Sequence, residues 1–148
     1  MHHTPRVFFE DVDVGHEVGP AVKTPTGEAV LEFCRVWGHD EPNRFTSADV
    51  ARREGLPGPI VPGIMSMAYM AQLLSDWATG GALRKLDVVF RQLVPHERPL
   101  HVAALVTDKR EEDGQGLVEL DVMLQTPEGD RYVGGKAVVA LPRRSGQA

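Results

Sequence analysis

The sequence predicts an α+β domain in which an antiparallel sheet packs against one long helix. Residues 63–78 are apolar nearly all round, as expected for a helix that is buried on most sides. Four stretches typical of strands then follow one another through short turns, which favours antiparallel pairing. A long apolar helix laid across such a sheet gives a two-layer domain around one hydrophobic core.

The first half of the chain is predicted to contain one strand and two helices before the buried helix. A first strand is expected near residues 16–22. Residues 27–37 carry apolar side chains at helical spacing, and Thr26 is the expected N-cap. Gly38 is well placed to end this helix. A further short helix is expected at residues 49–54.

The second half of the chain is predicted to consist of strands. The expected segments are 83–93, 100–109, 116–125 and 132–141. Leu120, Val122 and Leu124 alternate with polar residues, which is typical of a strand with one buried face. The adjacent Gly134 and Gly135 lie inside the last segment and predict a bulge there.

Length and composition predict one cytoplasmic domain over residues 1–148, with a core at about 8–141 and a flexible tail at 142–148. The single cysteine, Cys34, excludes an intrachain disulfide. The net charge of −5 argues against a nucleic-acid partner. No apolar run is long enough for a signal peptide or a membrane span. No residue cluster has metal-ligand spacing and no Gly-rich phosphate loop is present, so neither a metal nor a cofactor is expected.

The segment 38–63, GHDEPNRFTSADVARREGLPGPIVPG, contains the candidate functional residues. It leaves one helix at Asp40 and enters the buried helix through a Pro/Gly-rich bend that ends at Gly63. A connection of about 24 residues inside a compact domain is usually functional or disordered. The layout resembles the motif G-D-x-N-P-[I/L]-H of the MaoC-like (R)-specific enoyl-thioester hydratases and dehydratases. The resemblance spans roughly residues 8–141 and implies the hot-dog fold, in which a curved sheet wraps a central helix.

The resemblance also implies a reaction, the reversible hydration of a 2-enoyl-CoA or 2-enoyl-carrier-protein thioester. Asp40 takes the position of the family's acid–base Asp, and the N–H of Gly63 would hold the thioester oxygen. The family's His, five residues after the Asp, is replaced by Phe45, and the His that precedes the helix Gly is replaced by Pro62. His39 and Glu41, the two neighbours of Asp40 in the chain, are candidates for the second proton-transfer group.

Each of these residues also has a plainer interpretation. Asp40 would only cap a turn, His39 would be a surface residue, and Gly63 would only allow close packing at the helix start. The Ser66 hydroxyl would contact a ligand or, more simply, bond back to a carbonyl of its own helix. The residues expected to line the substrate site are Phe45, Pro62, Ile64 and Ser66.

Three functions remain open from the sequence. The chain is a hydratase, a non-catalytic acyl-thioester-binding subunit paired with a second hot-dog chain that carries the intact motif, or a thioesterase. The third is least favoured because Asp76, the only acidic residue of the helix, lies near its end. Exposed sheet edges favour a homodimer or heterodimer, with an acyl-CoA or acyl-carrier-protein thioester as ligand. Four basic residues either form a solvated face or contact the ligand's phosphates: Arg84, Lys85, Arg91 and Arg98.

Overall fold

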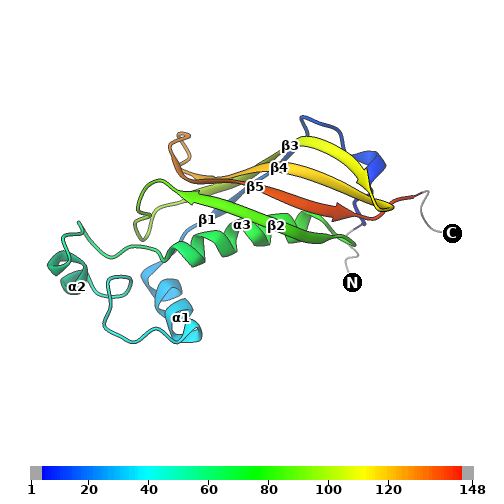
Figure 1. Ribbon diagram of the computed structural model, residues 1–148. Helices are drawn as coiled ribbons and strands as arrows, with labels where there is room; N and C mark the ends of the chain where they lie inside the picture. The colour runs from blue at the N-terminus through cyan, green and yellow to red at the C-terminus, as the bar shows by residue number, and fades with distance from the viewer. Residues whose placement is uncertain (1–4, 145–148) are drawn as a thin grey trace.

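A computed structural model describes residues 5–144 of the chain (Figure 1). Its elements, in order, are η1 (Phe9–Asp11), β1 (Glu17–Lys23), α1 (Gly27–Trp37), α2 (Ala48–Arg53), α3 (Gly63–Trp77), β2 (Ala82–Phe90), β3 (Leu100–Glu112), β4 (Gln115–Gln125) and β5 (Arg131–Leu141). Every predicted helix and strand is therefore present. The last four residues of the predicted flexible tail, 145–148, lie outside the described part. Arg143 forms an ion pair with Glu111 at 2.8 Å, and Arg144 forms one with Asp11 at 2.6 Å.

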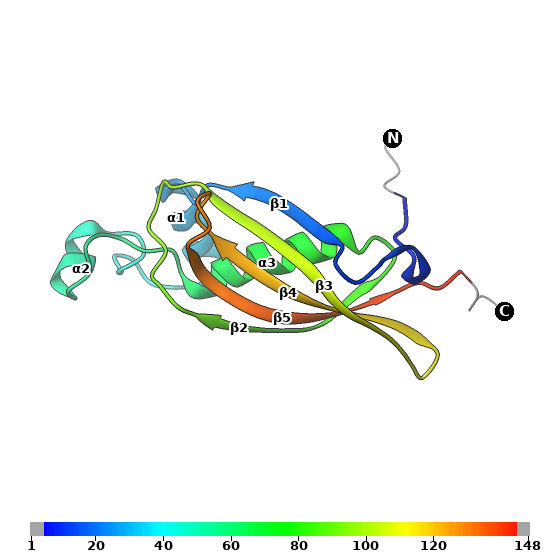
Figure 2. The same ribbon diagram turned by 90° about the horizontal axis from the view of Figure 1, so that it is seen from above.

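The sheet is antiparallel and has five strands in the order β1-β3-β4-β5-β2. The helix α3 lies across one face of this sheet (Figures 1 and 2). The helix α2 extends beyond one end of the sheet and α1 lies at that same end, whereas the described part of the chain begins and ends at the other end. The predicted α+β architecture, a sheet wrapped around a central helix, is confirmed.

The core lies between α3 and the facing side of the sheet. The predicted alternation along β4 is confirmed, because Leu120, Val122 and Leu124 are all buried. Met70 and Leu74 of α3 are fully buried against them in the same core cluster. Burying an aliphatic side chain of this size contributes about 1.5–3 kcal/mol. This packing fixes α3 on the sheet and with it the position of the residues at its N-terminus.

One side of α3 is not covered by the sheet. Ile64, Ala68 and Gln72 follow one another at four-residue spacing and are exposed. The prediction that this helix is buried on most sides is therefore too strong, because β2 is the last strand of the sheet and no element among residues 5–144 covers this stripe beyond it. No helix among residues 5–144 is long and apolar enough to cross a membrane.

The predicted bulge at Gly134 and Gly135 is wrong. Both glycines pair in regular register with β2 on one side and β4 on the other. A Cβ on Gly135 would collide with the carbonyl oxygen of Asp87 on the neighbouring strand. Close approach of two backbones, rather than a bulge, thus explains the glycine. A register irregularity of β2 lies between Leu83 and Lys85.

Candidate functional site

The helix α1 ends where the sequence predicts and delivers Asp40 to the surface. The Thr26 hydroxyl accepts a hydrogen bond from the N–H of Ala29 at 3.0 Å, which caps the start of the helix. Gly38 adopts a left-handed conformation with φ of 83° and ends it. Asp40 follows two residues later and is exposed. Among the described residues, its carboxylate forms no hydrogen bond or ion pair, so it is free to act on a ligand.

Asn43 fixes the bend that follows Asp40. Its side-chain oxygen accepts hydrogen bonds from the N–H groups of Phe45 at 2.8 Å and Thr46 at 3.1 Å. Its side-chain nitrogen donates to the backbone carbonyl of Asp40 at 3.0 Å. Asn43 is only 7% exposed, which is uncommon for this residue type. Asn43 therefore positions both Asp40 and Phe45. The sequence could have indicated this role, because Asn side chains in turns often form hydrogen bonds with the backbone two residues ahead.

Replacing Asn43 with Ala is expected to lower the free energy of unfolding by about 1–3 kcal/mol, because buried N–H groups lose their acceptor. Asn43→Asp keeps the acceptor oxygen but places a charged oxygen against the Asp40 carbonyl in a buried position, so it should also be destabilising at neutral pH. Urea unfolding of the two variants tests this role. Equal stability of the Ala variant and the wild type would show that the bend does not depend on Asn43.

His39 packs against the residue that replaces the expected motif His. The imidazole of His39 stacks on the ring of Trp37, with ring centres 5.0 Å apart and planes 14° from parallel. Its ring centre also lies 5.5 Å from that of Phe45, and Trp37 and Phe45 are 6.3 Å apart. We call these three residues the aromatic cluster. The cluster places an imidazole directly beside position 45, although from a different point in the chain.

Glu41, the other neighbour of Asp40, is not a free carboxylate. It forms an ion pair with Arg35 at 2.7 Å, and the hydrogen bond and charge of Glu41 raise the pKa of that guanidinium. Glu41 is thus less suited than His39 to act as a second proton-transfer group. Burial, followed by the nearby negative charge of Glu41, raises the pKa of the Cys34 thiol. Cys34 is fully buried in the core.

The helix α3 begins without a side-chain cap. Its N-cap residue is Pro62, and the N–H groups of Met65 and Ser66 both donate to the Pro62 carbonyl, at 3.0 and 3.2 Å. Across residues 5–144, the N–H groups of Gly63 and Ile64 donate to no backbone carbonyl. The unpaired donors of a helix start, together with its partial positive charge, favour a negatively charged oxygen. Gly63 therefore keeps the property that the oxyanion prediction requires.

Gly63 is also tightly packed. A Cβ at this position would lie 3.1 Å from the ring of Phe90, at the end of β2. The packing interpretation and the oxyanion interpretation are compatible, because the ring covers the Cα side of the glycine while its N–H stays unpaired. Phe90 is 52% exposed, so its outer side is open to a ligand or to another chain. The sequence contained no signal that would bring residues 63 and 90 together.

Ser66 is 1% exposed, and its hydroxyl has no hydrogen-bond partner among the described residues. The expected bond back to its own helix is absent. The carbonyl one turn earlier, that of Pro62, already accepts two N–H groups. An unpaired buried hydroxyl costs on the order of 1–3 kcal/mol and calls for an explanation. A ligand group or a bound water would supply the missing partner.

Hydrogen bonds hold the two halves of the 38–63 segment together. The N–H of Ile60 donates to the carbonyl of Arg44 at 3.3 Å. The ring nitrogen Nε2 of His96 lies 3.2 Å from the Ile60 carbonyl oxygen, and the N–H of Val61 donates to Val94 at 2.8 Å. The bend that carries Asp40 and the entrance to α3 are therefore anchored to each other and to the loop before β3.

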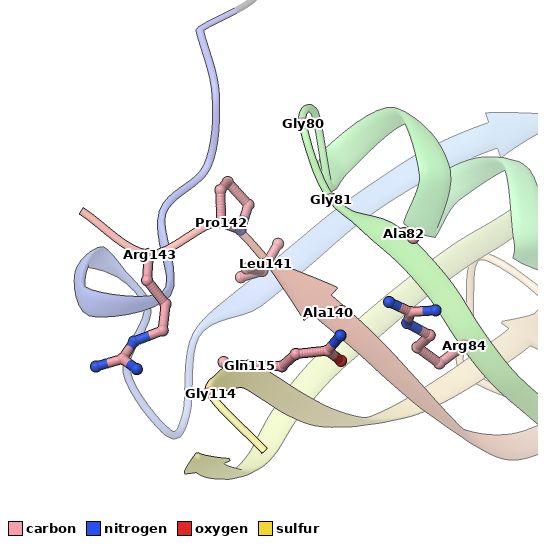
Figure 3. Close-up of a pocket in the computed structure, with 11 residues that line it drawn as sticks. Gly80, Gly81, Ala82, Arg84, Gly114, Gln115, Ala140, Leu141, Pro142 and Arg143 are labelled. Carbon is pink, nitrogen blue, oxygen red and sulfur yellow. The ribbon is translucent and has the colours of Figure 1, made fainter. Parts of the chain in front are cut away.

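Two of the hollows in the described part of the chain adjoin the two ends of α3. One, of about 390 Å³, lies beyond the C-terminal end of the helix, among Gly80, Gly81, Arg84 and the ends of β4 and β5 (Figure 3). A 15-residue helix rises about 22 Å, so this pocket is remote from Gly63. The second, of about 440 Å³, starts next to Gly63 and has a mainly apolar lining: Ile64, Met67, Ala68, Ala71, Leu83 and Leu86, with Arg84 and Lys85 at its edge. We call it the α3–β2 hollow. Among residues 5–144, no group of His, Cys, Asp and Glu side chains could hold a metal ion.

The sequence model of the MaoC-like domain matches residues 44–126, more than half of the chain. The chain belongs to the MaoC-like dehydratase family. The matched region begins just after His39 and Asp40 and includes the other predicted site residues: Phe45, Pro62, Gly63, Ile64 and Ser66. A search of curated proteins found no match.

Solved structures of MaoC-like proteins share this fold. The (R)-hydratase from A. caviae, described as involved in PHA biosynthesis, superposes with a TM-score of 0.78 and 21% identity over 90% of this chain and 99% of that one. The R-hydratase PhaJ1 from Pseudomonas aeruginosa superposes with a TM-score of 0.82 and 18% identity over 94% of this chain and 88% of that one. The HadBC (3R-hydroxyacyl-ACP dehydratase) complex from Mycobacterium tuberculosis contains a chain that superposes with a TM-score of 0.71 and 17% identity. The match covers 86% of this chain and 96% of that one. Both single-protein hydratases and a two-protein complex are thus built on the hot-dog fold seen here.

Proposed function

We propose that this MaoC-like chain reversibly hydrates 2-enoyl thioesters of coenzyme A or of a carrier protein to 3-hydroxyacyl thioesters. The proposal rests mainly on the arrangement of two groups. A free carboxylate, Asp40, and a helix start with unpaired N–H groups, at Gly63, belong to one hydrogen-bonded segment of a MaoC-like domain. These are the two kinds of group that hydration of an enoyl thioester requires.

In the proposed reaction, Asp40 takes a proton from water while the water oxygen bonds to C3 of the substrate. The electron pair of the C2–C3 double bond moves toward the thioester carbonyl, and negative charge develops on its oxygen. The N–H of Gly63 donates to that oxygen, and the partial positive charge of the helix start stabilises it. Collapse of this charge as C2 takes up a proton completes the addition of water.

His39 is proposed as the group that gives the proton to C2. It is adjacent to Asp40 in the chain, and stacking on Trp37 together with tilted packing against Phe45 limits how its ring turns. An imidazole nitrogen can give up a proton and take one back, which protonation of C2 and the return of the site to its starting state both require. Phe45, in the position of the family's His, then has a packing role in the substrate site, together with Pro62 and Ile64.

Ser66→Ala is expected to have opposite effects on stability and on substrate binding. Removing an unpaired buried hydroxyl should raise the free energy of unfolding by about 1 kcal/mol. If the hydroxyl contacts the bound thioester, its loss should also raise KM by up to about tenfold. Urea unfolding and steady-state kinetics measure the two effects. An unchanged KM would remove Ser66 from the substrate site.

We further propose that a second hot-dog chain completes the site. The α3–β2 hollow begins at Ile64, next to the proposed oxyanion donor, and its apolar lining is open to solvent in the single chain. A protein chain placed over this hollow would bury the lining and exclude water from one side of the thioester-binding region. Exclusion of water strengthens the electrostatic interactions on which the proposed chemistry depends.

A second candidate function is that of a non-catalytic subunit, and Phe45 at the position of the motif His favours it. Such a chain would bind the acyl thioester and pair with a different hot-dog chain that carries both catalytic groups. Thioester hydrolysis remains a third possibility. It has little support, because Asp76 is exposed near the C-terminal end of α3, far from Gly63.

Incubation of the purified chain with crotonyl-CoA and with a longer 2-enoyl-CoA separates the three functions. Hydration is followed by loss of the enoyl-thioester absorbance, and hydrolysis by release of free thiol. The proposal predicts loss of absorbance without thiol release. Binding of the acyl-CoA without turnover would identify a non-catalytic subunit, and thiol release would identify a thioesterase.

A further inference from the structure

We infer that a hollow on the outer face of the sheet binds a small amphipathic anion, an aliphatic carboxylate whose head group is held by Arg91 and Arg131. The outer face is the side away from α3 (Figures 1 and 2). The hollow has a volume of about 570 Å³, which lies within the range of about 300–1,000 Å³ that is usual for small-molecule pockets. We call it the outer-face hollow. Binding there does not depend on the proposed reaction.

The floor of the outer-face hollow is formed by three neighbouring strands, β2, β5 and β4. Val89 of β2 and Met123 of β4 both lie opposite Gly134 of β5, so these three positions share one face of the sheet. This face is the outer one, because Val122 and Val133, which precede Met123 and Gly134 in the chain, are buried in the core. Since Gly134 has no side chain, it leaves a depression between Val89 and Met123.

The lining of the hollow suits an apolar body. Val89 is 59% exposed, and the side chains of Met123 and Leu105 continue the apolar surface toward β3. The distance from β2 to β4 is two strand spacings, roughly 10 Å. This surface is long enough to carry an aliphatic chain of several carbons, whose removal from water favours binding.

The charges around the hollow leave two arginines without a partner. Five charged residues line it: Asp87, Arg91, Asp121, Arg131 and Lys136. Lys136 forms an ion pair with Asp121 at 3.1 Å, and Asp87 forms one with Lys85 at 3.2 Å. Within residues 5–144, the guanidinium groups of Arg91 and Arg131 form no ion pair. Two unpaired cations in one hollow repel each other and attract an anion.

The side chain of Arg131 lies over the floor of the hollow. Its Cδ and Nη1 atoms are 3.0 and 3.6 Å from the position that a Cβ on Gly134 would take. Its Nη2 atom lies 3.9 Å from the Sδ of Met123. A thioether sulfur is only a weak acceptor, so this contact does not replace a carboxylate. The guanidinium is therefore placed beside apolar surface, where the head group of an amphipathic anion would meet it.

A carboxylate with an aliphatic chain matches both features of the hollow. Guanidinium groups bind carboxylates through paired, charge-assisted hydrogen bonds. Asp87 and Arg91 are four residues apart along the chain, so the acidic and basic sides of the hollow are separated by roughly 13 Å. The acidic side repels an anion, which fixes the head group at Arg91 and Arg131. The chain then lies on the apolar surface between the two sides.

The outer-face hollow is separate from the proposed thioester site. Gly63 lies on the other side of the sheet, where the ring of Phe90 packs against it. Phe90 pairs with the buried Val133, whereas the preceding residue, Val89, pairs with Gly134 of the hollow. An aliphatic carboxylate in the outer-face hollow should therefore bind at the same time as an acyl-CoA at the proposed site.

Calorimetric titration of the purified chain with octanoate tests the role of the two arginines. The wild type should show saturable binding of one octanoate per chain. Arg91→Gln and Arg131→Gln should each raise the dissociation constant by roughly tenfold or more, because each removes charge-assisted hydrogen bonds to the head group. Arg98→Gln is the matched control, since Arg98 is exposed, forms no ion pair in the described chain and lies outside the hollow.

The affinity of the Arg98 variant should equal that of the wild type. An equal loss in all three variants would show a general effect of net charge and would overturn the inference. The absence of saturable binding by the wild type at millimolar octanoate would also overturn it. Circular dichroism of each variant confirms that the chain is folded.

Two further ligands test the two parts of the proposed ligand. Octanol keeps the chain without the charge, and acetate keeps the charge without the chain. Both should bind at least about tenfold more weakly than octanoate. Octanol bound as tightly as octanoate would show that the arginines do not hold the head group, and acetate bound as tightly would show that the apolar floor has no role.

Two last measurements locate the bound octanoate. Gly134→Leu fills the floor of the hollow and should weaken octanoate binding, whereas saturating crotonyl-CoA should leave the affinity of the wild type for octanoate unchanged. Displacement of octanoate by crotonyl-CoA would place it in the thioester site and overturn the inference, as would undiminished binding by a folded Gly134 variant. None of these measurements requires turnover, so a chain without hydratase activity would refute the proposed reaction and leave the outer-face site intact.

Discussion

Asp40→Asn is expected to lower the rate of enoyl-thioester hydration by on the order of 10² to 10⁴, the usual cost of losing a general base. The amide has nearly the same shape as the carboxylate and cannot take a proton from water. The free energy of unfolding should change by less than about 0.5 kcal/mol, because the side chain is exposed and makes no hydrogen bond within the described chain. Crotonyl-CoA hydration and urea unfolding provide the two measurements.

Asp76→Asn is the matched control for this prediction. Asp76 is also an exposed carboxylate, at the end of α3 remote from Gly63, and the proposed reaction gives it no role. Its replacement should leave hydration unchanged. Full activity of the Asp40 variant, or an equal loss in both variants, would remove Asp40 from the catalytic role.

Gly135→Ala is expected to be the most destabilising single methyl addition in the sheet, with a loss of about 3 kcal/mol or more. The added Cβ would collide with the backbone carbonyl oxygen of Asp87, and it would lie 2.9 Å from the Cα of Val88. Neither atom can move without displacing β2.

Gly134→Ala separates this effect from the general cost of changing a glycine in a strand. The nearest atom to a Cβ at residue 134 is the Cδ of Arg131, at 3.0 Å, in a flexible and exposed side chain that can turn away. The Gly134 variant should therefore remain within about 1 kcal/mol of the wild type. Thermal or urea unfolding compares the two, and equal effects would show that the backbone contact at Gly135 does not determine its identity.

The parts of the fold that depend on local patterns could be predicted from the sequence. The start and end of α1 follow from Thr26 and Gly38, which satisfy the backbone groups at the two helix ends. The alternation of Leu120, Val122 and Leu124 predicts the buried face of β4 because side chains alternate along a strand. Such signals involve residues within a few positions of one another.

Features that depend on distant contacts could not be predicted in this way. The ring of Phe90 covers Gly63, and the carbonyl of Asp87 excludes a side chain at Gly135, from segments far along the chain. The same limit explains why the pair of glycines was misinterpreted as a bulge. A glycine that allows a close approach and one that allows a bend are indistinguishable until the neighbouring strand is known.

The candidate site was predicted only in part for a related reason. The sequence identifies Asp40 and Gly63 through a motif, but it does not show that His39 packs on Phe45 or that the Ser66 hydroxyl lacks a partner. Ring packing and hydrogen-bond satisfaction depend on side-chain geometry. Because the His39 imidazole lies beside Phe45, it is the group to test as a replacement for the motif His that position 45 lacks.

The most direct test of this account is the initial rate of crotonyl-CoA hydration by His39→Gln, measured against the wild type and against His101→Gln. His101 lies on the outer face of β3, and the proposed reaction gives it no role. The account predicts turnover by the wild type and by the His101 variant, with a loss of on the order of 10² or more in the His39 variant. Undiminished hydration without His39 would contradict the claim that its imidazole replaces the missing motif His.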